Sequence, residues 1–139
     1  MSYLLDTNVV SEWTKVRPHA GVVSWLHEVD EDRVFLSVIT LAELRYGVDR
    51  LPTGTRRGIL DAWLANELPL RFESRILPID SAVADASGRL TAQAEARGRT
   101  LSAMDALIAG TAVVHGLTVV TRDTGDFEIA VKSVLNPWS

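Results

Sequence analysis

Short apolar runs alternate with longer amphipathic stretches along the chain, and this rhythm limits the fold more than any other feature of the sequence. Apolar residues recur at helical spacing in the longer stretches, as at Val22, Leu26 and Val29. Runs that are apolar throughout and alternate with helices favour a parallel sheet covered by helices on both faces, an α/β fold. The predicted strands are 3–5, 34–38, 75–79, 117–121 and 131–135. The predicted helices lie around 22–29 and over 40–50, 56–71, 81–97 and 102–115.

Length and composition exclude several classes of protein. A chain of 139 residues with 47% hydrophobic and 23% charged residues is typical of one globular domain, here 1–139. Without cysteine it has no disulfide, no thiolate zinc site and no cysteine nucleophile. The longest apolar stretch, 106–114, is shorter than the roughly 20 residues that span a bilayer, and no export signal precedes it, so we expect a cytoplasmic protein without a membrane partner. A net charge of −4 argues against a sequence-independent coat on nucleic acid.

Acidic residues occur where predicted strands end. Asp6 follows the first strand, Glu43 lies in the first turn of the helix after the second, and Asp123 follows the fourth. Ligands of open parallel sheets bind outside the carboxyl ends of the strands, so these side chains are expected at one site. Asp105 lies in the first turn of the helix that leads into the fourth strand, and it joins them only if that helix starts at the same edge.

Helix capping is the alternative explanation for Glu43 and Asp105. Each is the fourth residue of a segment that begins with Thr or Ser, which is the pattern of a capping box. Asp123 fits a turn, and Asp80 fits the N-cap of the helix from 81. Asp6 fits neither, since a carboxylate that closes an apolar strand is not expected at a capping position and Asp is rarely buried without a partner.

Carboxylates gathered in one place have a chemical consequence. Two of them about 4 Å apart repel by about 4 kcal/mol at an effective dielectric constant of 20, so the group needs a cation or raised pKa values. An all-oxygen ligand set suits Mg²⁺ or Mn²⁺. Such ions activate water and offset charge on phosphate oxygens, so the pattern predicts metal-dependent hydrolysis of phosphodiesters.

Four segments resemble PIN-domain ribonucleases: Leu4–Val9, Ser37–Leu44, Ser102–Ala109 and Val119–Phe127. The ending Asn136-Pro137-Trp138 is similar to VapC-type toxins of the FitB-like branch. The resemblance covers essentially the whole chain. It implies a PIN-like three-layer α/β/α sandwich with a five-stranded parallel sheet, in which the third strand lies at the edge and Asp80 outside the pocket.

The resemblance also implies an activity. A protein of this family is the toxin of a type II toxin–antitoxin system, an endoribonuclease that hydrolyses RNA phosphodiester bonds with Mg²⁺ or Mn²⁺. Its typical substrates are tRNA or rRNA. It forms a homodimer and is inhibited by a cognate VapB-like antitoxin, in some cases within a larger toxin–antitoxin assembly.

The family's site residues transfer by position. The acidic catalytic and metal-binding quartet falls on Asp6, Glu43, Asp105 and Asp123. The supporting polar residues fall on Thr7, Asn8 and Thr121, although Thr7 and Asn8 also fit simple turn chemistry. Many relatives carry Asn where this chain has Asp123, followed by an acid that matches Asp126. Asp123 is therefore the first candidate for the fourth acid and a metal ligand, and Asp126 the second.

Two other functions fit parts of the pattern. In a non-catalytic α/β binding module the acids would only cap helices, and no specific Mg²⁺ or Mn²⁺ site would form. A phosphatase of the haloacid-dehalogenase type also places Asp at the end of its first strand. That chemistry normally needs a second Asp two residues later, where this chain has Asn8.

Overall fold

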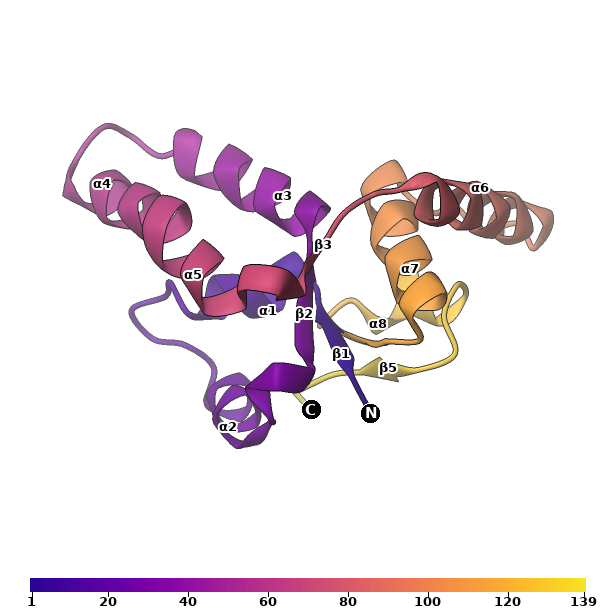
Figure 1. The fold of residues 1–139 in the computed structure, drawn as a ribbon, viewed down its shortest axis with the longest axis horizontal. Helices are drawn as coiled ribbons and strands as arrows, with labels where there is room; N and C mark the ends of the chain where they lie inside the picture. The colour runs from indigo at the N-terminus through magenta and orange to yellow at the C-terminus, as the bar shows by residue number, and fades with distance from the viewer.

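Five parallel strands form one sheet in the order β3-β2-β1-β4-β5 in a computed structural model that describes all 139 residues (Figure 1). Leu4 of the central strand pairs with Phe35 on one side and Val119 on the other. The predicted α/β fold is confirmed, with β3 at one edge of the sheet. The strands are β1 Tyr3–Leu5, β2 Val34–Ser37, β3 Ile76–Leu77, β4 Thr118–Val120 and β5 Val134–Leu135.

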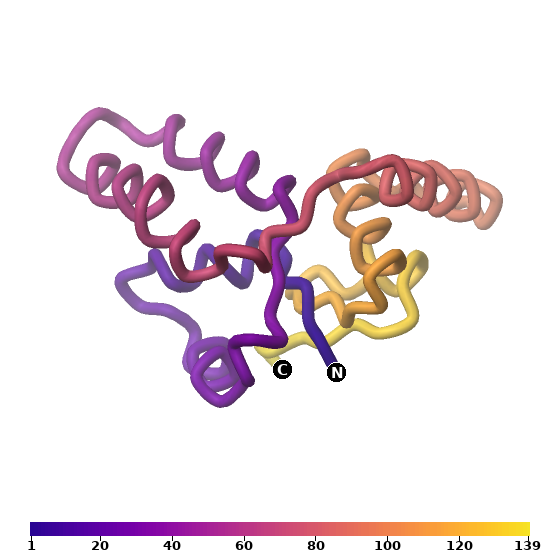
Figure 2. Tube along the Cα trace, viewed as in Figure 1, coloured from indigo at the N-terminus to yellow at the C-terminus, as the bar shows by residue number.

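Helices cover both faces of this sheet, α1 to α5 on one side and α6 to α8 on the other (Figure 2). Successive strand residues point to opposite faces, so Leu5 packs into the first core and Leu4 into the second. This is why the strands are apolar throughout. No helix has both the length and the apolar character needed to cross a membrane. The helices are α1 Thr7–Glu12, α2 Ala20–Glu28, α3 Val38–Asp49, α4 Thr55–Ala62, α5 Leu68–Phe72, α6 Ser81–Ala96, α7 Ala103–His115 and α8 Thr124–Glu128.

The starts of two helices correct the sequence analysis. Helix α3 begins at Val38 because Ser37 caps it, its Oγ accepting the Ile39 N–H at 3.0 Å. Glu43 therefore lies in the second turn, where the capping box cannot explain it. Helix α1 was not predicted because one and a half turns show no periodicity. Asp6 is its N-cap, since its Oδ1 accepts the Thr7 N–H at 2.8 Å, so the expectation that Asp6 is not at a capping position is wrong.

Prolines account for two further differences. The helix predicted over 56–71 is divided into α4 and α5 by a π turn, Trp63–Glu67. Pro69, just after this turn, has no N–H and its ring clashes with the carbonyl four residues before it, which the wider turn accommodates. Strand β3 ends at Leu77 rather than 79, since Pro78 follows and cannot donate to the ladder.

Gly110 lets α6 and α7 approach closely, which sets the position of α7 on the sheet. A Cβ at Gly110 would fall on Ser87 Oγ and lie 2.9 Å from the Val83 carbonyl oxygen, whereas a Cβ at Gly88 would meet nothing within 4 Å. We expect Gly110→Ala to lower the free energy of unfolding by about 1–3 kcal/mol through overpacking. Gly88→Ala, the control on α6, should raise it by about 0.5–1 kcal/mol. Urea unfolding checks both; equal midpoints for the two variants would contradict this packing.

Candidate functional site

Asp6 lies at the carboxyl end of the central strand and is 6% exposed. Because β1 and β4 are parallel with Leu5 opposite Val120, the next residues, Asp6 and Thr121, meet at the same edge. Thr121 Oγ1 donates to Asp6 Oδ2 at 2.8 Å, while Asp6 Oδ1 caps α1. Both carboxylate oxygens are thus fixed from two neighbouring elements.

Asn8 connects Asp6 to Asp123. Its Nδ2 donates to Asp123 Oδ2 at 3.2 Å and to Asp6 Oδ2 at 3.4 Å. The Asp123 N–H donates to Thr121 Oγ1 at 2.9 Å, which holds the start of α8 against β4. The polar residues Thr7, Asn8 and Thr121 thus lie among the acids, and Asn8 contacts the loop after β4.

Glu43 reaches the same edge from α3. Thr7 Oγ1 donates to Glu43 Oε1 at 2.6 Å, and Thr40 Oγ1 lies 3.5 Å from Thr7 Oγ1. Thr40 is fully buried and was interpreted in the sequence only as a helix cap. It lies three residues before Glu43, the spacing that places two side chains on one helix face, and that spacing was the signal for its place here.

Asp105 joins the group because α7 begins at the carboxyl edge of the sheet. Ser102 Oγ accepts the Asp105 N–H at 3.2 Å, so half of the predicted capping box forms. Burial raises the pKa of Asp105, and repulsion from Asp126, Glu43 and Asp123 adds to this, against a hydrogen bond from Ser102. The carboxylate of Asp105 is therefore close enough to the other acids to be repelled by their charge.

The same crowding acts on Asp6. Burial raises its pKa to about 6, and repulsion from Asp105 and Glu43 contributes in the same direction. The hydrogen bonds from Thr121 and Thr7 oppose the rise only in part. Three carboxylates from β1, α3 and α7 thus act on one another electrostatically.

Asp123 and Asp126 interact with different members of this group. Asp123 is bonded to Asn8, whereas Asp126, in the first turn of α8, is the carboxylate that repels Asp105 most strongly. Asp80 lies apart, after the edge strand β3. Its Oδ1 accepts the Val83 N–H at 2.9 Å, so it caps α6 as predicted.

The donor chemistry fits a hard divalent cation, because the group offers only oxygen ligands and carries several mutually repelling negative charges. The arrangement is nevertheless not a closed cage. No three Asp, Glu, His or Cys side chains are placed so that they could together hold a metal ion. Instead, the Thr7 hydroxyl donates a hydrogen bond to an oxygen of Glu43, and the Thr121 hydroxyl donates one to an oxygen of Asp6.

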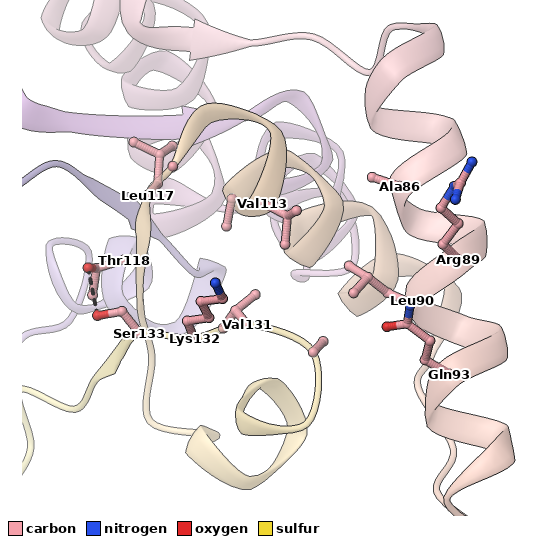
Figure 3. Close-up of a pocket in the computed structure, with 13 residues that line it drawn as sticks. Ala86, Arg89, Leu90, Gln93, Val113, Leu117, Thr118, Val131, Lys132 and Ser133 are labelled. Carbon is pink, nitrogen blue, oxygen red and sulfur yellow. Dashed lines mark hydrogen bonds between the residues drawn. The ribbon is translucent and has the colours of Figure 1, made fainter.

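The structure has two hollows of note, one beside the acids and one far from them. A groove of about 200 Å³ between α1, α3 and α4 is lined by Thr7 and Glu43, so it opens onto the site. A larger cavity of about 620 Å³ lies at the amino-terminal end of β4, opposite the end of the strands at which the acids lie (Figure 3). Its lining includes Arg89 and Lys132 and no acid, so it has no part in binding a cation.

Comparison with known proteins gives consistent matches over nearly the whole chain. The model of the PIN domain family matches residues 3–132. Toxin FitB of Neisseria gonorrhoeae is 44% identical, over 97% of this chain and 97% of FitB. VapC ribonuclease Y4jK of Sinorhizobium fredii is 41% identical, over 97% and 96%. The tRNA(fMet)-specific endonuclease VapC of Shigella flexneri is 30% identical, over 100% and 99%.

Solved structures agree with these matches. The structure of FitAB bound to an IR36 DNA fragment superposes with a TM-score of 0.94 at 41% identity, covering 99% of this chain and 96% of the matched one. The crystal structure of FitAcB from Neisseria gonorrhoeae superposes with a TM-score of 0.93 at 43% identity, covering 98% of both. Both relatives were solved as complexes, the first of them on DNA.

Proposed function

This chain belongs to the PIN-domain family, within its VapC/FitB group of toxin ribonucleases from type II toxin–antitoxin systems, and from this premise we propose that its carboxylate-lined sheet edge binds Mg²⁺ or Mn²⁺ and hydrolyses RNA. One observation carries the proposal. Asp6 is buried at the carboxyl end of the central strand and repelled by Glu43 and Asp105, so its ionised form needs a compensating cation.

Asp6, Glu43 and Asp105 would hold the ion, and Asp123, with Asp126 as second candidate, would complete the acidic site. When bound, the ion activates water and offsets charge that develops on the phosphate. The other residues support these acids. Asn8 holds Asp6 and Asp123 in a fixed relation through its amide, and Thr121 and Thr7 fix the orientation of the Asp6 carboxylate.

Binding of the ion requires Glu43 to change partner. In the structure its Oε1 accepts a 2.6 Å hydrogen bond from Thr7, so this oxygen must exchange a hydroxyl for the ion. Glu43 lies on the second turn of α3 and is half-buried, which leaves its side chain room to rotate. A site that closes on its ion is consistent with carboxylates that are kept apart by their mutual repulsion.

The partners follow from the same family. We propose that a VapB-like antitoxin inhibits the enzyme by laying a segment in the groove between α1, α3 and α4, with a cationic side chain directed at the acids. The FitAB and DNA-bound VapBC structures of relatives support such a complex. We further propose a homodimer, tRNA or rRNA as substrate, and action in the cytoplasm, where these RNAs are.

Metal dependence tests the function. Purified protein should cleave RNA with Mg²⁺ or Mn²⁺ present and lose the activity in excess EDTA, while small phosphate esters remain intact. Calorimetry should show a saturable Mn²⁺ site that Glu43→Gln weakens at least tenfold, since a ligand charge is removed. Glu28→Gln, on the exposed face of α2, is the matched control. Cleavage that persists in EDTA would refute the metal dependence, and the absence of both cleavage and a saturable site would favour a binding module.

A further inference from the structure

Arg122 lies between two residues of the acidic edge. Its neighbour Thr121 donates to Asp6, and its other neighbour Asp123 is bonded to Asn8. The Arg122 N–H also donates to Asn8 Oδ1 at 3.4 Å. The backbone of Arg122 is therefore held at the rim of the site by the same hydrogen bonds that orient the carboxylates.

The guanidinium group of Arg122 donates no hydrogen bond to any acceptor in the structure. Nine of the twelve Arg side chains donate to a carboxylate or a backbone carbonyl; the three others are Arg17, Arg50 and Arg122. Of these three, only Arg122 adjoins residues of the site. Glu12 is attracted by its charge, but the buried Glu12 carboxylate is already bonded to Lys15 and the His19 N–H.

Trp138 holds this free guanidinium in place. The Arg122 Cζ lies 4.7 Å from the centre of the Trp138 ring, a cation–π contact. The ring packs against the first core and beside His19, and Asn136 Oδ1 accepts the backbone N–H of Trp138 at 2.9 Å, which fixes the main chain that carries the ring. Stacking restrains the side chain but leaves its N–H donors free, which reduces the entropy lost when they bind an anion.

An acidic site repels RNA, because every phosphate carries a negative charge. The backbone of Arg122 lies at the rim, and its guanidinium group, stacked on Trp138 on the side of Glu12, offers a permanent positive charge one residue from Asp123. Such a group matches phosphate oxygens with two parallel hydrogen bonds. We infer that Arg122, restrained by the ring of Trp138, binds an RNA phosphate next to the cleaved bond. This rests on the proposed function and names Arg122 as a substrate-binding residue and Trp138 as a positioning residue.

Binding without cleavage tests the inference. In an Asp6→Asn background, fluorescence anisotropy follows a labelled single-stranded RNA at several salt concentrations. Arg122→Gln should weaken binding about tenfold at low salt, the loss of one charge-assisted pair. It should also lower the slope of log K against log salt by about 0.7, the value for one phosphate contact. Arg122→Lys should keep the slope.

Arg50→Gln is the matched control, since Arg50 also stacks on a ring, that of Tyr46 at 5.2 Å, but lies at the far end of α3. Its slope should equal that of the parent. Trp138→Leu should lower affinity less than Arg122→Gln, and the two changes together should be less than additive. A slope for Arg122→Gln equal to that for Arg50→Gln would overturn the inference.

The two proposals fail separately. If the wild-type protein cleaves no RNA and its RNA binding still depends on Arg122, the proposed function is refuted and only the phosphate contact of Arg122 stands. If the wild-type protein cleaves RNA and Arg122→Gln leaves KM unchanged, the inference is refuted alone. The expected result is a raised KM with kcat within about twofold, as for a contact made equally in ground and transition states.

Discussion

Asp6→Asn should abolish RNA cleavage, with a loss of at least about a thousandfold, while the protein stays folded. Metal ions supply several kcal/mol of transition-state stabilisation, and about 4 kcal/mol corresponds to a thousandfold in rate. The change removes one charge from the ligand set. The amide oxygen can still accept the Thr7 N–H, and Asn is as good an N-cap as Asp. The amide nitrogen replaces the oxygen that accepts from Thr121, so the Thr121 hydroxyl must turn to accept from it instead.

Asp80→Asn is the matched control for this experiment. Asp80 also follows a strand and also caps a helix, with its Oδ1 on the Val83 N–H, but it lies after the edge strand β3. Its substitution should leave the rate within about twofold. Single-turnover cleavage and circular dichroism of both variants measure the effect. Wild-type cleavage by Asp6→Asn would remove Asp6 from the reaction.

The fold was predictable because its signals are local. Strands that are apolar throughout indicated a sheet covered on both faces, and the helices α6 and α7 follow clear periodicity up to glycines at 98 and 116 with positive φ. The short helices α1 and α8 were missed because five or six residues carry no period. The start of α3 was misplaced because Ser37 and Thr40 are both good caps, and burial of Thr40 in the tertiary structure decides between them.

The candidate site was predictable to the extent that it follows from sheet topology. Parallel strands bring Asp6 and Thr121 together wherever β1 and β4 are neighbours. The position of Asp105 was conditional on the edge at which α7 starts. Helix α7 ends at His115 and the parallel strand β4 begins at Thr118, so the helix must start at the carboxyl edge. The hydrogen bond of Glu43 with Thr7 joins residues on two helices, which spacing within either helix cannot predict.

Asp6 should also make the protein less stable at neutral pH than in mild acid when metal is absent. Its pKa rises from 3.8 in the unfolded chain to about 6 in the folded one, chiefly through burial. Between these values the folded state binds more protons than the unfolded state, so the free energy of unfolding falls as pH rises. The shift corresponds to roughly 3 kcal/mol, complete above pH 6. Asp6→Asn should lack this loss.

The informative quantity is the difference between wild type and Asp6→Asn, since groups that do not interact with Asp6 titrate equally in both proteins. Urea unfolding in EDTA at pH 4, 5, 6 and 7.5 should show curves that converge near pH 4 and separate by roughly 3 kcal/mol at pH 7.5, with the variant the more stable. Parallel curves would mean that folding does not raise the pKa of the Asp6 carboxylate.

Metal should offset most of this loss, because proton and cation compete for the same oxygens. A ligand present at about a hundred times its Kd stabilises the folded state by about 2.7 kcal/mol. Added Mn²⁺ should therefore stabilise the wild type at pH 7.5 and much less at pH 5, where Asp6 is protonated, and should leave Asp6→Asn nearly unaffected. Equal stabilisation of both proteins would place the ion elsewhere. A buried, repelled carboxylate is thus a cost to the empty fold that the bound ion offsets, which links the stability of this protein to its proposed chemistry.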